Sequence, residues 1–221
     1  MRVVIAGGHG KIALLLERLL SQRGDSVAGI IRNPDQAGDL QDVGAEVIVL
    51  DLEDASVDEL AQQLTGADAV VFAAGAGPGS GLQRKETVDR DAAILLADAA
   101  EAVGVERYLM ISAMGADHPQ DEGAVEPVFA AYLRAKAAAD EAVRARATLR
   151  STIVRPGMLT DDPGTGALQV ADQTGRGSIP RSDVAALLVA LLDAPDTAGQ
   201  TFEVISGDTP IVQAVAALRA R

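Results

Sequence analysis

The sequence predicts an α/β protein built on a doubly wound parallel sheet. Short runs of β-branched and other apolar residues alternate along the chain with longer segments of helical periodicity. The apolar runs are almost uninterrupted, which is typical of parallel strands covered by helices on both faces. A glycine-rich stretch lies between the first apolar run and the first helical segment, where a tight strand-to-helix turn is needed.

The order of the elements supports this fold. Strands are expected in the apolar runs at residues 2–6, 26–32, 46–52, 68–75, 106–112 and 150–157. Helices are expected in the segments between and after them, at residues 11–23, 35–42, 56–65, 84–103 and 127–146. Because a helix follows nearly every strand, right-handed crossovers would bring the strands together in one parallel sheet.

The pattern loosens after Gly157. A loop rich in Pro, Gly and Asp at residues 160–168 precedes a short helix, a strand and a final helix, at 183–193, 201–206 and 212–221. This tail is too small and too interleaved for an independent domain. We therefore expect one domain over residues 1–221, to which residues 157–221 contribute a small substrate or lid lobe.

Composition excludes several classes of function. The net charge of −13 and the scarcity of aromatic residues disfavour nucleic-acid binding. The absence of cysteine excludes disulfides and thiolate chemistry and favours the cytoplasm. No apolar run is long enough to span a membrane. The two histidines, His9 and His118, belong to no cluster with metal-ligand spacing, so no metal is expected.

The glycine-rich stretch "VVIAGGHGKIA" predicts a dinucleotide site. Gly7, Gly10 and Ala13 stand three residues apart at the junction of the first strand and the first helix. Small residues there let backbone N–H groups approach a pyrophosphate and let the helix pack close to the strand. A P-loop is excluded, because Lys11 is followed by Ile12 and the spacing of the glycines is wrong.

The end of the second strand should select the cofactor. An acidic residue at this position would favour NAD, but the chain has Arg32, whose guanidinium matches a 2′-phosphate. A solvated arginine is the alternative reading, and we expect NADP rather than NAD. The expected cofactor-binding residues are Gly7, His9, Gly10, Lys11, Ile12, Arg32, Asp51, Leu52, Ala73, Ala74, Gly75, Lys136 and Pro156.

Several motifs resemble the atypical short-chain dehydrogenase/reductases, in particular NAD(P)H-binding proteins described as epimerases or dehydratases. They are the glycine loop, "VLDLED", "VVFAAGAG", "ETVDRDAAILLADAA", "RYLMISAMGAD", "TIVRPGMLTDDPGTG" and "GSIPRSDVAALLVALLDAP". The resemblance implies a Rossmann fold and a catalytic set of Tyr132, Lys136, Asp89 and Ser112. Asp89 replaces the usual Asn of that set. Ala113 stands where many relatives carry a second hydroxyl residue.

The spacing of Tyr132 and Lys136 predicts an acid/base pair. Residues four apart share one helix face, so both side chains can point toward one ligand. A nearby ammonium would stabilise the phenolate and lower the pKa of the tyrosine. The chain uses lysine only three times against sixteen arginines, so a lysine here is notable. A patch of ordinary helix surface is the alternative interpretation.

Two functions remain open. The first is an NADP-dependent oxidoreductase or epimerase that acts on a small carbonyl or hydroxyl compound. The second is a non-catalytic protein that senses NADP(H) and contacts another protein. The Tyr132 and Lys136 pair favours the enzyme. The expected partner is a small-molecule substrate, and the expected state is a monomer or a homodimer.

Overall fold

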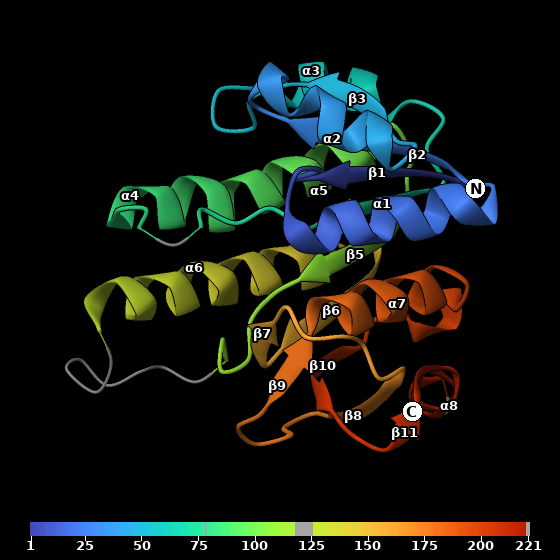
Figure 1. Cartoon of the computed structure of the whole chain (residues 1–221). Helices are drawn as coiled ribbons and strands as arrows, with labels where there is room; N and C mark the ends of the chain where they lie inside the picture. The colour runs from blue at the N-terminus through green and yellow to red at the C-terminus, as the bar shows by residue number, and fades with distance from the viewer. Residues whose placement is uncertain (78, 118–125, 220–221) are drawn as a thin grey trace.

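The apolar runs of the sequence form the strands of one large sheet. The computed structural model describes residues 1–77, 79–117 and 126–219, and within them the strand order is β11-β8-β10-β6-β5-β4-β1-β2-β3 (Figure 1). The parallel strands are β1 (Arg2–Ala6), β2 (Ser26–Ile31), β3 (Glu46–Val49), β4 (Ala69–Phe72), β5 (Arg107–Ile111), β6 (Arg150–Pro156) and β10 (Thr201–Ser206). The predicted fold class is confirmed.

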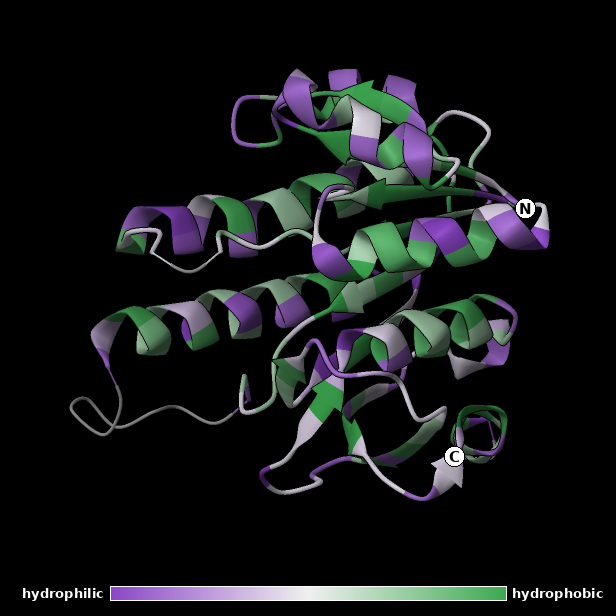
Figure 2. Ribbon diagram, viewed as in Figure 1, coloured by the Kyte–Doolittle hydropathy of each residue, from purple (hydrophilic) through white to green (hydrophobic). Residues whose placement is uncertain are grey.

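Helices cover both faces of this sheet. On one face, α1 (Lys11–Arg23) packs against α7 (Arg181–Leu192). The other face carries α3 (Val57–Leu64), α5 (Ala92–Ala102) and α6 (Pro127–Arg144). Successive residues of the central strand face opposite layers, since Val3 and Ile5 join one apolar core and Val4 joins the other. Figure 2 shows the strands as mainly hydrophobic and the helices as a mixture of hydrophobic and hydrophilic residues.

Two expected helices are more complex than their periodicity predicted. Residues 35–42 divide into a 3-10 turn, η1 (Pro34–Gln36), and α2 (Ala37–Asp42). The long helix expected at 84–103 divides into the single turn α4 (Leu82–Arg84), the π-helical segment η2 (Lys85–Asp91) and α5. A π-helical turn places side chains four residues apart more nearly in line than an α-helix does, and such turns are frequent at functional sites.

The tail contributes both to the main sheet and to a smaller layer beside it. Strand β10 pairs with β6, while β8 (Ala167–Ala171) and β11 (Thr209–Pro210) extend the sheet in antiparallel orientation. Strands β7 (Met158–Thr160) and β9 (Ser178–Pro180) form a separate parallel pair. The turn η3 (Pro195–Thr197) and helix α8 (Ile211–Leu218) complete the chain as described. That these residues act as a lid stays a prediction.

Candidate functional site

The site lies where the strand order of the sheet reverses. Strand β1 is flanked by β2 and β4, because the chain places β2 and β3 on one side of β1 and then crosses back to place β4 on the other. In open parallel sheets, ligands bind at the carboxyl ends of the strands at such a point. The loop after β1 and the segment after β4 therefore border one crevice.

The glycine loop after β1 leaves no room for a side chain at Gly7 or Gly8. Gly7 has a φ of +84°, and a Cβ there would lie 2.6 Å from the Ala74 Cα. The backbone N–H groups of Gly7 and Gly8 donate to the Ile30 carbonyl at 3.2 and 2.9 Å, which fixes the loop against β2. Gly10 then begins α1, whose first turn carries no acidic residue. A glycine loop that leads into a helix N-terminus without acidic side chains fits the negative charge of a pyrophosphate.

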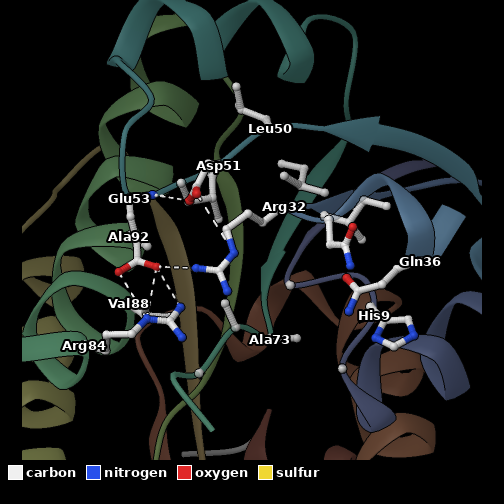
Figure 3. A pocket seen from close by; sticks show the side chains of 18 residues that line it. His9, Arg32, Gln36, Leu50, Asp51, Glu53, Ala73, Arg84, Val88 and Ala92 are labelled. Atoms are coloured by element: carbon white, nitrogen blue, oxygen red, sulfur yellow. Dashed lines mark hydrogen bonds and ion pairs between the residues drawn. The ribbon is translucent and has the colours of Figure 1, made fainter. Parts of the chain in front are cut away.

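A cavity of about 330 Å³ opens beside this loop (Figure 3). It brings together most of the expected cofactor residues, namely Gly7, His9, Gly10, Arg32, Asp51, Leu52, Ala73, Ala74 and Gly75. His9 pairs with Asp39 at its edge, at 2.7 Å. Lys11 is directed elsewhere, because its Nζ pairs with Asp161 at 2.5 Å and its side chain is 67% exposed.

Arg32 is paired with acidic side chains at the base of this cavity. Its Nη1 lies 2.9 Å from Glu53 Oε2, and its Nε lies 4.0 Å from Asp51 Oδ2. Arg84 binds the same Glu53 oxygen at 2.7 Å, so one carboxylate joins two guanidiniums, as Figure 3 shows. A hydrogen bond from Arg84 is the main cause that holds the pKa of Glu53 below its usual value. Arg84 and Glu53 were not predicted from the sequence.

A second cavity, of about 480 Å³, continues from the first. Ala73, Ala74 and Gly75 line both cavities, and Ile12 lines only the second. The four expected catalytic residues all border it: Asp89, Ser112, Tyr132 and Lys136. Residues from η2, β5 and α6 thus meet around one space at the far end of the cofactor crevice.

Lys136 is buried and held on several sides. Its Nζ donates to the Ile111 carbonyl at 3.1 Å and lies 3.6 Å from Asp89 Oδ1. The Tyr132 ring centroid lies 6.0 Å from Lys136 Nζ. Burial lowers the pKa of Lys136, and the Asp89 charge opposes that shift. The fully buried Asp89 in turn accepts from the Ala76 N–H at 3.4 Å.

The pKa of Tyr132 lies above its ordinary value, which is opposite to the direction expected from the Lys136 ammonium alone. Burial raises the pKa of Tyr132, and the charges of Asp89 and Asp140 act in the same direction. A phenol in such surroundings keeps its proton at neutral pH. Transfer of that proton to a ligand would therefore need nearby groups that stabilise the phenolate.

Behind Ser112 lies a buried ion pair that sequence reasoning missed. The Nε of Arg155 lies 2.9 Å from Asp140 Oδ2, and its Nη1 lies 2.8 Å from Asp117. Burial raises the pKa of Asp140, and the Ser112 hydroxyl and Arg155 oppose that shift. Asp140 follows Lys136 by one helical turn, so the helix face of Tyr132 and Lys136 continues into this pair.

A third cavity, of about 1060 Å³, adjoins the second at Ser112, Phe129, Tyr132 and Leu159. The layer formed by β7 and β9 supplies one wall, with Met158 and Leu159. Pro156, which was expected to bind the cofactor, lines this cavity instead of the first two. Two arginines also line the third cavity: Arg181, which pairs with Asp161 at 2.6 Å, and the exposed Arg176.

His118 lies outside the described residues, and the described residues form neither a metal cluster nor a membrane-spanning helix. No group of three or more His, Cys, Asp or Glu side chains there could hold a metal ion. None of the helices described is long and apolar enough to cross a membrane.

Comparison with known proteins supports a nucleotide site. Residues 7–195 match the model of a family described as NAD(P)H-binding. A Bacillus subtilis protein named an uncharacterized sugar epimerase is 36% identical, over 97% of this chain and 99% of its own length. A Bacillus halodurans structure, described as a candidate NAD-dependent epimerase/dehydratase, is 37% identical with a TM-score of 0.89, covering 98% and 99% of the two chains. An oxidoreductase from Lactococcus lactis is 26% identical with a TM-score of 0.85, covering 100% and 98%.

Proposed function

Because the chain belongs to the NAD(P)H-binding family and is an NAD(P)-dependent oxidoreductase or epimerase, we propose that it is an NADP-dependent reductase of a carbonyl compound, with Tyr132 as the proton donor. The observation that carries this proposal is the protonated phenol of Tyr132 beside the cofactor crevice. A phenol carries its proton at neutral pH, and reduction of a carbonyl requires a proton donor at the oxygen.

The crevice fits a nicotinamide dinucleotide along its length. The glycine loop and the N-terminus of α1 would hold the pyrophosphate, since a Cβ at Gly7 would strike Ala74 and close the approach. Lys136 would donate to the nicotinamide ribose. Ala73, Ala74 and Gly75 line both cofactor cavities and leave room for a cofactor that passes from one to the other.

The preference for NADP rests on two guanidiniums. Arg32 and Arg84 converge on Glu53 at the adenosine end, so a 2′-phosphate entering there would find two bidentate donors. It would also have to displace or share Glu53. The name of the Bacillus halodurans relative includes NAD, so the choice of cofactor needs its own measurement.

The residues of the chain would carry out one proton transfer and would stabilise the charge that this transfer leaves behind. The bound nicotinamide supplies the hydride to the carbonyl carbon. Tyr132 would give its hydroxyl proton to the carbonyl oxygen, and Ser112 would donate a second hydrogen bond to that oxygen after its single hydroxyl proton turns away from Asp140. Lys136 stabilises the phenolate that remains, and its contacts with Ile111 and Asp89 keep the ammonium in place. Tyr132 then recovers a proton from solvent.

The substrate would occupy the third cavity. Its volume of about 1060 Å³ lies just above the usual range for ligand pockets, and Met114, Phe129, Leu133 and Met158 give it an apolar lining. Phe129 and Met158 are 48% and 71% exposed, so these side chains remain available for a ligand. We therefore propose a substrate with an apolar body, larger than the small compound expected from the sequence.

The proposal is tested by a screen for turnover together with cofactor binding. Consumption of NADPH and NADH would be followed over aldehydes, ketones, quinones and flavins, and cofactor affinity would be titrated in parallel. The proposal predicts NADPH-dependent reduction of at least one apolar carbonyl compound, with transfer of deuterium from NADPH labelled at the nicotinamide C4. Tight binding of NADPH without turnover of any compound would favour the non-catalytic sensor.

A further inference from the structure

Lys85 is a buried cation that the proposed chemistry does not yet use. It begins the η2 segment, is only 8% exposed and lines the second cavity. Its Nζ donates to the Gly77 carbonyl at 3.0 Å and makes no ion pair with any residue in the described part of the chain. An ammonium has three donors, and a buried one is costly unless its charge serves a partner.

The Nζ of Lys85 lies 5.4 Å from the centroid of the Tyr132 ring. This is closer than the 6.0 Å that separates Lys136 from the same centroid. Lys136 is engaged by the Ile111 carbonyl, Asp89 and the Phe72 ring at 5.2 Å. Two of the three lysines of this arginine-rich chain therefore contact one tyrosine.

From one face of the helix, two side chains of the η2 segment reach the second cavity. Lys85 and Asp89 are four residues apart, and both are buried at its wall. Asp89 holds Lys136, whereas Lys85 faces the ring of Tyr132.

We propose that Lys85 is a positioning residue for the acid function of Tyr132, whose ammonium stabilises the charge left on the phenol oxygen as its proton passes to the substrate. The proposal rests on the function proposed above. In that step the O–H bond of Tyr132 breaks, and a new O–H bond forms on the former carbonyl oxygen. The hydride bound to the nicotinamide carries the two electrons to the carbonyl carbon. The cation near the ring favours the phenolate over the neutral phenol.

Other charges also act on Tyr132. From η2 it is faced by Asp89, and from α6 by Lys136 and Asp140. Glu126, which precedes the first turn of α6, lines the same cavity. The carboxylates oppose ionisation of the phenol, so the two lysines are the groups that favour it.

Ionisation of Tyr132 can be measured without any substrate. The chain has two tyrosines and no tryptophan, so a Tyr108→Phe background leaves Tyr132 as the only phenol. Ultraviolet absorbance of the phenolate would be titrated from neutral pH to about pH 11 in this background, with Lys85 intact, as Lys85→Met and as Lys85→Arg. Arg90→Met is the matched control, because Arg90 belongs to η2 but pairs with Asp91 at the surface.

The proposal predicts that Lys85→Met raises the pKa of Tyr132 by about one unit or more, or leaves it un-ionised over a range where the parent ionises. Lys85→Arg should restore most of the ionisation, and Arg90→Met should leave it unchanged. An equal fraction of phenolate in parent and Lys85→Met at a pH where the folded parent ionises would overturn the proposal; if burial keeps Tyr132 neutral in both up to about pH 11, an unchanged kcat in Lys85→Met overturns it.

Turnover separates this inference from the function on which it rests. On a substrate found by the screen, Lys85→Met should lower kcat by about tenfold or more, with an NADPH Kd within about twofold of the parent. Lys85→Arg should recover most of kcat. Unchanged kcat in Lys85→Met would overturn the catalytic part of the proposal. A shifted titration in a protein that reduces no compound would refute the proposed function, while leaving the effect of Lys85 on Tyr132 established.

Discussion

Glu17 should make the stability of the protein fall as pH rises. This residue of α1 is fully buried, and neither carboxyl oxygen has a hydrogen-bond partner among the described residues. A Cβ added at Gly8 would lie 3.0 Å from Glu17 Oε1, so the carboxyl group sits directly behind the glycine loop. Burial raises the pKa of Glu17 from 4.5 to about 8. The native protein therefore holds this group in its neutral form at pH 7.

The sign and the size of the effect follow from this shift. Below pH 4.5 the carboxyl is protonated in both folded and unfolded chains, so its titration does not lower the free energy of unfolding. As pH rises, the unfolded chain ionises first, and the native state loses stability until about pH 8, where both forms are ionised. At 1.36 kcal/mol per pKa unit, the loss is about 1 kcal/mol at pH 5, about 3 kcal/mol at pH 7 and at most about 5 kcal/mol above pH 8.

Glu17→Gln removes this titration while keeping the shape of the side chain. We expect the variant to gain stability over the parent by an amount that grows between pH 5 and pH 8. Urea unfolding followed by far-ultraviolet circular dichroism at several pH values measures that difference. Glu106→Gln, at an exposed position, is the control and should show no such trend. A Glu17→Gln difference that stays constant or shrinks with pH would refute the reasoning.

Three further substitutions test the cofactor crevice by titration with NADPH and NADH. Arg32→Ala should weaken NADPH by about 1.5–3 kcal/mol and hardly change NADH, whereas equal losses would remove Arg32 from 2′-phosphate recognition. Glu53→Gln should strengthen NADPH, because it frees Arg32 and Arg84 from a competing carboxylate; a selective loss of NADH would instead assign Glu53 to the ribose hydroxyls. Gly10→Val should abolish binding of both cofactors in a folded protein, and normal affinity would place the nucleotide elsewhere.

Much of the fold could be predicted because strand and helix periodicities differ. The central strands are nearly continuous apolar runs, and the glycine loop marks the first crossover. The division of residues 84–103 was not predictable in the same way. A π-helical turn of seven residues shifts the apolar pattern too little to be distinguished from an α-helix, so the placement of Lys85 beside Tyr132 became visible only in three dimensions.

The site was predictable where it depends on strand ends and helix spacing. Asp51, Gly75 and Ser112 follow parallel strands, whose carboxyl ends meet at one edge, and the cavities contain all three. Pairings between distant segments carried no sequence signal, as with Arg84 and Glu53. Helix spacing also brought Tyr132 close to Lys136 without revealing how deeply the phenol is buried, which is why the direction of its pKa shift was mistaken.

The most direct test of the central claim is the turnover of Tyr132→Phe on a substrate identified by the screen. This variant loses only the phenol hydroxyl, so its NADPH Kd should match that of the parent while kcat falls by about 10²–10⁴-fold. Lys136→Ala, measured beside it, should damage both quantities, because Lys136 serves the ribose as well as the phenol. Full activity of Tyr132→Phe on that substrate would contradict the account, since the proton would then come from solvent or from another group.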